Sequence, residues 1–236
     1  MELRGASALV TGAGRGIGRA TALALGKAGV QVTAVSRTAS ELESLVREIE
    51  SAGGRAVAFS GNIRERAVCD GAVARAVQAH GGLQVLVNNA AVAGFAAFAE
   101  MTDEQWADVL ETNLTAPFRL TRAALPHLAW KGGHVFMISS LAGKNPVAGL
   151  SAYCASKAAL DHLAACLMLE VRQKGVKVTT IAPGSVDTSF GGPPSAGGSW
   201  KLQAEDVAGA VLDLLRTRDD AHLSRVEMRP LRPPKA

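Results

Sequence analysis

The sequence is poor in aromatic residues, cysteine and net charge, and it contains no long hydrophobic run. Only 4% of the 236 residues are aromatic and the net charge is +4, which argues against a nucleic-acid-binding surface. The apolar runs end well short of the ~20 residues that a membrane-spanning helix needs. Cys69, Cys154 and Cys166 lack metal-ligand spacing, so we expect reduced thiols and no metal site. A nucleophilic role for Cys154 would lack a paired histidine in the sequence.

The chain alternates regularly between β-rich and helical patterns. Hydrophobic residues make up 48% of it, and no linker or repeat divides it, so we predict one domain over residues 1–236. Strands are expected at residues 6–11, 30–36, 56–59, 83–88, 135–139 and 176–182, with helices between them. This alternation predicts an α/β fold, a doubly wound parallel sheet with helices on both faces. Residues 1–4 show no signal-peptide pattern, which predicts a cytoplasmic protein.

A glycine-rich turn joins the first predicted strand to the first helix. It contains Gly12, Gly16 and Gly18, with one more residue in the first gap than the commonest dinucleotide fingerprint. Glycines there permit a tight turn and let backbone amides approach a pyrophosphate at the positive end of the helix. The turn predicts a dinucleotide site, and a glycine turn without a ligand is the alternative.

The end of the second predicted strand indicates which dinucleotide would bind. Sites for NAD usually carry an acid there, about 20 residues after the glycines, to bind the ribose 2′-hydroxyl. This chain has Ser36 and Arg37 at that point and no acid before Glu41, in the next helix. Ser36 and Arg37 suit a 2′-phosphate, and Arg15 of the glycine turn can approach the same group. We therefore predict NADP(H) rather than NAD(H), with an ordinary solvated arginine at Arg37 as the alternative.

Asn89 and Asn113 are two further candidates for a structural or functional role. Asn89 comes directly after the fourth predicted strand. We expect its side chain to bind nearby backbone and the adenosine side of the cofactor, with a simple strand ending as the alternative. Asn113 lies four residues before Pro117, which has no N–H and should bend the helix that begins near residue 102. The freed Asn113 carbonyl would then hold a water near Lys157, although a purely structural kink remains open.

Tyr153 and Lys157 are spaced to share one face of a helix. Ser151 is a plausible N-cap for that helix. A free tyrosine titrates near pH ~10, and a neighbouring cation typically lowers that pKa by about 1–3 units. Lys157 would thus make the Tyr153 phenol a working acid or base. A solvated helix face is the alternative when the pair is considered alone.

These motifs occur together in the order typical of one enzyme family. The chain resembles a single-domain short-chain dehydrogenase/reductase over about residues 6–227, through Gly12-x-x-x-Gly16-x-Gly18, Asn88-Asn89-Ala90, Asn113, Ser140, Tyr153-x-x-x-Lys157 and Pro183-Gly184. The resemblance implies a Rossmann fold with seven strands in the order 3-2-1-4-5-6-7, and a nicotinamide cofactor. It also implies that the catalytic residues are Asn113, Ser140, Tyr153 and Lys157. Ser140 matches better than the serine before it because it lies thirteen residues before Tyr153.

The resemblance extends the predicted cofactor site beyond the glycine turn. Pro183 and Gly184 resemble the segment that lines the nicotinamide, where Thr188 would hold the carboxamide and Val186 would supply backbone contacts. Asn62 departs from the family, which more often has an acid near the adenine. The full set of predicted cofactor-binding residues is Gly12, Arg15, Gly16, Ile17, Gly18, Ser36, Arg37, Asn62, Ile63, Asn89, Ala90, Tyr153, Lys157, Pro183, Gly184, Val186 and Thr188.

The substrate is less constrained than the cofactor. Candidates for an apolar pocket are Phe95, Phe98, Leu141, Val147, Leu150, Phe190 and Trp200, each of which would fit a core equally well. Similarity to bacterial 3-oxoacyl-ACP reductases implies a 3-oxoacyl thioester, including one bound to an acyl carrier. Small ketones, sugars or hydroxy amino acids are alternatives. A protein that senses or holds NADP without turnover is a further alternative, against which the four retained catalytic positions argue.

Two segments near the C-terminus complete the predictions. Residues 185–203 are rich in glycine and proline and are expected to form a substrate lid. The basic, proline-rich residues 228–236 are expected to form a surface arm outside the site. The resemblance also implies a homo-oligomer, a dimer or tetramer assembled through the helices that begin near residues 102 and 153.

Overall fold

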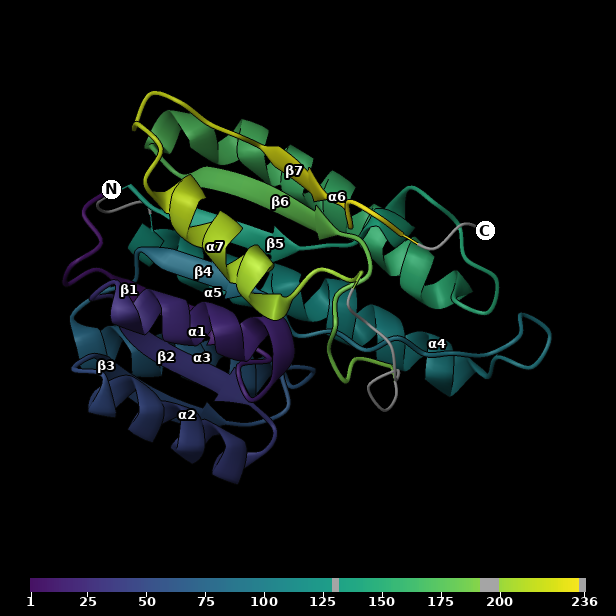
Figure 1. Ribbon diagram of the computed structural model, residues 1–236, viewed down its shortest axis with the longest axis horizontal. Coiled ribbons are helices and arrows are strands. Elements are labelled where there is room, and N and C mark those ends of the chain that lie inside the picture. The colour runs from purple at the N-terminus through teal and green to yellow at the C-terminus, as the bar shows by residue number, and fades with distance from the viewer. Residues whose placement is uncertain (129–131, 192–199, 234–236) are drawn as a thin grey trace.

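Residues 1–128, 132–191 and 200–233, which the computed structural model describes, contain one seven-stranded parallel sheet (Figure 1). The strands are β1 (Ser7–Thr11), β2 (Gln31–Ser36), β3 (Arg55–Ser60), β4 (Val85–Asn88), β5 (His134–Ile138), β6 (Lys177–Pro183) and β7 (Arg225–Met228). Their order in the sheet is β3-β2-β1-β4-β5-β6-β7, as expected. Six strands match the sequence patterns to within two residues at either end. The seventh, β7, pairs in parallel with β6 at the edge of the sheet.

Helices cover both faces of the sheet (Figure 1). They are α1 (Gly16–Lys27), α2 (Ala39–Ser51), α3 (Arg66–His80), α4 (Asp103–Leu110), α5 (Ala116–Leu128), α6 (Ser151–Val171) and α7 (Ala204–Leu215). The core is accordingly in two parts. One contains buried residues of α1, α2 and α7, and the other contains buried residues of α3, α5 and α6.

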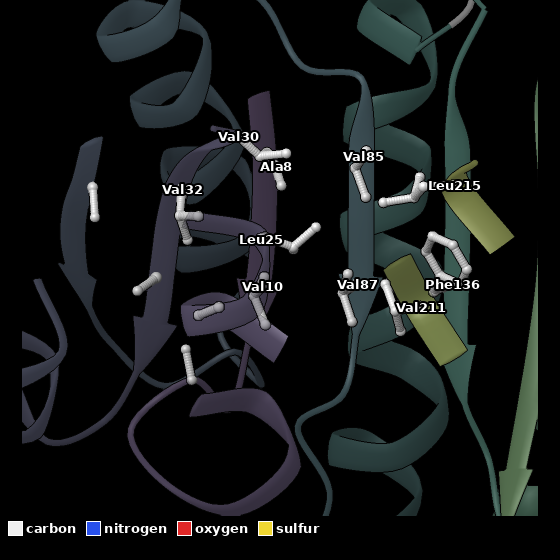
Figure 2. Packing of buried hydrophobic residues seen from close by; sticks show 14 of the residues in the cluster. Ala8, Val10, Leu25, Val30, Val32, Val85, Val87, Phe136, Val211 and Leu215 are labelled. Carbon is white, nitrogen blue, oxygen red and sulfur yellow. The ribbon is translucent and has the colours of Figure 1, made fainter. Parts of the chain in front are cut away.

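Strand β1, in the interior of the sheet, is buried on both faces, which explains its continuous apolar run. Val10 packs into the layer beneath α1 and α7, whereas Leu9 packs into the opposite layer, because successive side chains in a strand point to opposite faces. Figure 2 shows the first layer, in which Leu25 of α1 and Val211 of α7 lie against the strands.

Two local expectations change. Leu150, and not Ser151, is the N-cap of α6, and Ser151 is the first helical residue. The helix α4 begins with a capping box, in which the Thr102 hydroxyl accepts from the Gln105 N–H and the Gln105 side chain accepts from the Thr102 N–H. Near Pro117 the chain forms a π-helical turn, Glu111–Thr115, which leads directly into α5. π-Helical turns are rare and are one of the causes of a kink in a helix. No helix among the described residues is long and apolar enough to cross a membrane.

Candidate active site

A cleft of about 1250 Å³ opens at the carboxyl ends of the strands. Segments that follow all seven strands line it, with Gly12 after β1, Arg37 after β2, Gly61 after β3, Asn89 after β4, Ser140 after β5, Gly184 after β6 and Arg229 after β7. The strand order reverses between β1 and β4, and ligands of open α/β sheets bind in the crevice at such a point. All the predicted site residues line this cleft except Gly18 and Asn113.

The glycine turn forms one wall of the cleft and fits a pyrophosphate. Gly12 has a left-handed φ of +65°, and a Cβ there would lie 2.9 Å from the Ala90 Cα. Gly16, the first residue of α1, has a φ of +54°. Among the described residues, no side chain caps this end of α1. The N–H groups of the first turn, which lack intrahelical partners, are therefore placed to bind phosphate oxygens.

Gly18 belongs to the packing of the turn and not to the cleft. A Cβ on Gly18 would overlap the Gly12 carbonyl oxygen and lie 2.5 Å from the Asn89 side-chain nitrogen. The absence of a side chain thus lets α1 pack closely on the turn. The predicted contact of Gly18 with a cofactor stays a prediction beside this supporting role.

Thr11 and Asn89 tie the glycine turn to the end of β4. The Thr11 hydroxyl accepts hydrogen bonds from the backbone N–H groups of Asn89 (3.0 Å) and Ala90 (3.1 Å). The Asn89 side chain donates to the Thr11 carbonyl at 2.8 Å. Asn89 therefore makes the backbone bonds predicted for it, and it also lines the cleft.

The far end of the cleft gathers the residues expected to choose between the dinucleotides. Arg15 and Arg37 are exposed there, and Ser36, which also lines the cleft, is the last residue of β2. Sequence reasoning missed Glu41, which lines the same end from the first turn of α2. The signal that could have found it is its position in the first turn of the helix that follows the second strand. The other predicted cofactor residues that line the cleft are Ile17, Asn62, Ile63, Ala90, Pro183, Gly184, Val186 and Thr188.

Ser140, Tyr153 and Lys157 meet at the opposite end of the cleft. Tyr153 and Lys157 lie one turn apart on α6, and the Lys157 Nζ is 5.6 Å from the centre of the Tyr153 ring. Lys157 is only 2% exposed, and its Nζ donates a 2.8 Å hydrogen bond to the Ile138 carbonyl at the end of β5. Gly143 lets the Ser140 loop approach, because a Cβ on it would lie 3.1 Å from the α6 backbone.

Burial is the largest influence on the pKa values of Tyr153 and Lys157. It raises the pKa of the Tyr153 phenol above its ordinary value of 10.0, and a hydrogen bond with the Ser140 side chain opposes the rise. Desolvation lowers the pKa of Lys157 to about 8. The predicted net lowering of the phenol's pKa is thus wrong for this structure. The reason is that both groups lose their hydration, which disfavours the phenolate and the ammonium alike.

Asn113 holds the loop beside the site instead of facing the cleft. It is 1% exposed and lies inside the π-helical turn. Its side chain accepts from the Val92 N–H (2.8 Å) and donates to the Val92 carbonyl (2.9 Å) and to the Ser156 hydroxyl (3.0 Å). Ser156 lies between Tyr153 and Lys157 on α6, so Asn113 connects the Val92 segment of the cleft wall to the helix that carries both. The side chain of Asn113 therefore has a positioning role, and the catalytic role predicted through its backbone carbonyl stays a prediction.

Replacing Asn113 by alanine is expected to lower the free energy of unfolding by about 3 kcal/mol. The substitution leaves the Val92 backbone and the Ser156 hydroxyl without these partners, and each unsatisfied buried group costs about 1–3 kcal/mol. Urea denaturation of the wild type and of N113A measures the difference. N145A, at an exposed asparagine of the loop after β5, is the control and should change stability by less than about 0.5 kcal/mol. Equal losses in the two variants would contradict the assignment.

The substrate half of the cleft is largely apolar. The Phe190 ring lies 5.7 Å from the Tyr153 ring, centre to centre. The other predicted pocket residues that line the cleft are Phe95, Leu141, Val147, Leu150 and Trp200. Phe98 is the exception, because it is 83% exposed and does not line the cleft.

The C-terminal arm, predicted to lie outside the site, forms part of the cleft wall. Arg229, Pro230 and Pro233 line the cleft. The Gly184 N–H donates a 2.8 Å hydrogen bond to the Met228 carbonyl, which fixes the arm beside the end of β6. The arm reaches the site because β7 runs parallel to β6, so the chain leaves the sheet at its carboxyl edge. Residues 234–236 of the predicted arm lie outside the described residues.

The predicted lid is anchored at both of its described ends. The Asp187 N–H donates to the Leu202 carbonyl at 2.8 Å, and the Leu202 N–H donates to the Ser185 carbonyl at 3.0 Å. Thr188 reaches the glycine turn, since a Cβ on Gly16 would lie 3.3 Å from its methyl group. Residues 192–199, the middle of the predicted lid, lie outside the described residues.

Comparison with known proteins gives a consistent set of relatives. The family model "short chain dehydrogenase" matches residues 6–196. The ketoacyl reductase HetN of Nostoc sp. is 34% identical over 224 residues, which cover 92% of this chain and 77% of that protein. An uncharacterized NAD-dependent oxidoreductase of Mycobacterium tuberculosis is 36% identical over 202 residues, covering 79% and 74% of the two chains. A metagenomic short-chain oxidoreductase solved in complex with NADP superimposes with a TM-score of 0.87, at 36% identity and 99% and 100% coverage.

Proposed function

Because the chain belongs to the short-chain dehydrogenase family, we propose that it is an NADP(H)-dependent oxidoreductase acting on a carbonyl compound or the corresponding secondary alcohol. The observation that carries the proposal is the meeting of Ser140, Tyr153 and Lys157 in the same cleft as the glycine turn. A bound NADP(H) supplies the hydride that the protein's own side chains cannot provide. The side chains supply the proton and the charge stabilisation.

The proton is assigned to Tyr153. During reduction the phenol donates it to the carbonyl oxygen, and during oxidation the phenolate takes it from the alcohol. Ser140 hydrogen-bonds the same oxygen while negative charge develops, which is the role of an oxyanion hole. The Lys157 Nζ lies over the Tyr153 ring, 5.6 Å from its centre. As the family resemblance implies, Lys157 also fits the ribose hydroxyls of the nicotinamide. Its charged form favours the phenolate when the phenol gives up its proton.

The proposed preference for NADP(H) rests on Arg15, Ser36 and Arg37. All three line the far end of the cleft, and both arginines are free of ion pairs within the described residues. Guanidinium groups bind phosphate through two parallel hydrogen bonds, which suits a 2′-phosphate. The relatives include one protein named as NAD-dependent and another that was solved in complex with NADP.

For the substrate, we favour a 3-oxoacyl thioester over small ketones, sugars or hydroxy amino acids. The apolar walls around Phe190 and Leu141 suit an acyl chain. Arg229, which lines the cleft and is paired with Glu227 at 3.1 Å, suits the phosphate groups of a carrier such as coenzyme A or an acyl carrier protein. A ketoacyl reductase among the relatives supports the same choice.

The direct test is a substrate panel with NADPH and NADH. It contains a 3-oxoacyl thioester, small ketones, sugars and hydroxy amino acids, and cofactor oxidation or reduction is followed by absorbance. Turnover of the thioester above the other compounds is expected. Cofactor binding without turnover of any compound would instead favour a protein that senses or holds NADP.

Replacing Arg229 by glutamine tests the carrier part of this proposal. We expect the KM for a 3-oxoacyl-coenzyme A to rise about tenfold with little change in kcat, because one charge-assisted contact to phosphate is lost. The KM for the matching N-acetylcysteamine thioester, which has no phosphate, should not change. R232Q, at an exposed arginine of the same arm that does not line the cleft, is the control. A KM that rises equally for both thioesters would contradict the role of Arg229.

We also propose that the protein forms a homo-oligomer. Trp106 on α4, Phe118 on α5 and Leu169 on α6 are large apolar residues that remain 39%, 43% and 57% exposed. Leu163 and Leu167 of α6 are partly buried and pack against the protein's own core. Sedimentation velocity of the wild type measures the assembly.

A further inference from the structure

A carboxylate packs directly on the glycine turn. Glu41 lies in the first turn of α2, and its side chain reaches back across the cleft wall to Gly14. A Cβ on Gly14 would overlap the Glu41 Oε2 and would lie 3.1 Å from both the Glu41 Cβ and the Ser36 hydroxyl oxygen. Glu41 and Ser36 therefore converge on one point of the turn, which only a glycine at position 14 leaves open.

This carboxylate is not neutralised by a neighbour. Within residues 1–128, 132–191 and 200–233, Glu41 forms no ion pair, although Arg15 and Arg37 line the same end of the cleft. The nearby Arg19 guanidinium donates to the Glu41 backbone carbonyl at 3.4 Å, but its ion pair is with Glu48 of the same helix, at 2.7 Å. The end of the cleft that would receive the adenosine ribose thus presents two cations and one unpaired anion.

The charges favour different dinucleotides. A carboxylate accepts hydrogen bonds from the two hydroxyls of a ribose, as the strand-end acid does in NAD sites. The same carboxylate repels a 2′-phosphate, and a phosphate carries close to two negative charges. Arg15 and Arg37 act in the opposite sense, because they attract the phosphate and gain little from a hydroxyl.

We infer that Glu41 is a selectivity residue that draws the site towards NAD(H) and so limits the preference for NADP(H) set by Arg15 and Arg37. It takes the place of the acid missing from the end of β2, but it acts from the first turn of the following helix. The inference rests on the proposed use of a nicotinamide dinucleotide. It goes further in assigning both dinucleotides to this site, with the balance set by a single carboxylate.

The test measures binding and does not require turnover. The dissociation constants of NADPH and NADH are determined by fluorescence titration for the wild type and for E41Q, which removes the charge and keeps the size of the side chain. E43Q is the matched control, because Glu43 is an exposed carboxylate on the same helix that does not line the cleft. R37Q is the variant with the opposite expected effect.

The wild type is expected to bind both dinucleotides. In E41Q the affinity ratio of NADPH over NADH should rise about tenfold, with the larger part of the change in NADPH, and the gain should shrink at high salt. R37Q should lower that ratio, and E43Q should change it less than twofold. An unchanged ratio in E41Q, with both dinucleotides still bound, would overturn the inference and leave the proposed function standing. A wild type that binds neither dinucleotide would overturn both.

Discussion

Replacing Tyr153 by phenylalanine is expected to lower turnover by a hundredfold or more and to leave the affinity for the dinucleotide nearly unchanged. The substitution removes one hydroxyl, and general acid–base catalysis by a positioned side chain contributes about 10²–10⁴-fold. The ring itself stays, so its packing against Phe190 and Lys157 is retained. Steady-state kinetics on the substrate found in the panel gives turnover, and fluorescence titration gives the affinity.

The contrary result is a Y153F protein with near-normal turnover. It would move the proton donor elsewhere in the cleft, for which Cys154 is a poor choice because it does not line the cleft. A second measurement is available because Tyr153 is the only tyrosine in the chain. The ultraviolet absorbance of phenolate therefore reports the titration of this one side chain. In the protein without a dinucleotide we expect the midpoint above pH 10.0, because burial raises the pKa of the phenol.

Replacing Lys157 by methionine is expected to cost at least a hundredfold in turnover and to change how stability depends on pH. Lys157 is buried, and its pKa is lowered from 10.5 to about 8. A charged lysine with a lowered pKa binds its proton less tightly in the folded state than in the unfolded state. Below about pH 8 this costs roughly 3 kcal/mol of stability, and the cost is relieved as the pH rises from about 8 to 10.5.

The stability of the wild type relative to K157M should therefore increase with pH across that interval. Other groups that titrate there cancel in the comparison, because they are present in both proteins. Urea denaturation at several pH values measures the difference. K174M, at an exposed lysine, is the control and should follow the wild type. A constant difference between the wild type and K157M from pH 8 to 10.5 would show that the amine is not desolvated.

Much of the fold followed from local patterns. The buried run of β1, the glycines at the start of α1 and the helical periodicity of α2 are properties of neighbouring residues, so they can be interpreted without the rest of the chain. The placement of Tyr153 and Lys157 on one helix face is also a local property, because any helix puts residues four apart on the same face. Six strands and the strand order were predicted on this basis and through the family resemblance.

The site needed more than local patterns wherever distant segments meet. The side chain of Asn113 binds Val92 and Ser156, partners that the sequence did not indicate and that the π-helical turn and the packing of α6 bring within reach. The arm that carries Arg229 was placed on the surface, but its entry into the cleft depends on the parallel pairing of β7 with β6.

The sequence by itself determined the parallel sheet, the glycine turn and the tyrosine–lysine pair, because periodicity, backbone freedom and helical spacing act over a few residues. Only the tertiary structure decided that Glu41 meets Gly14, that the arm lines the cleft and that burial raises the pKa of Tyr153. Desolvation and contact between distant segments depend on everything packed around a side chain, and neighbours in the sequence do not specify those surroundings.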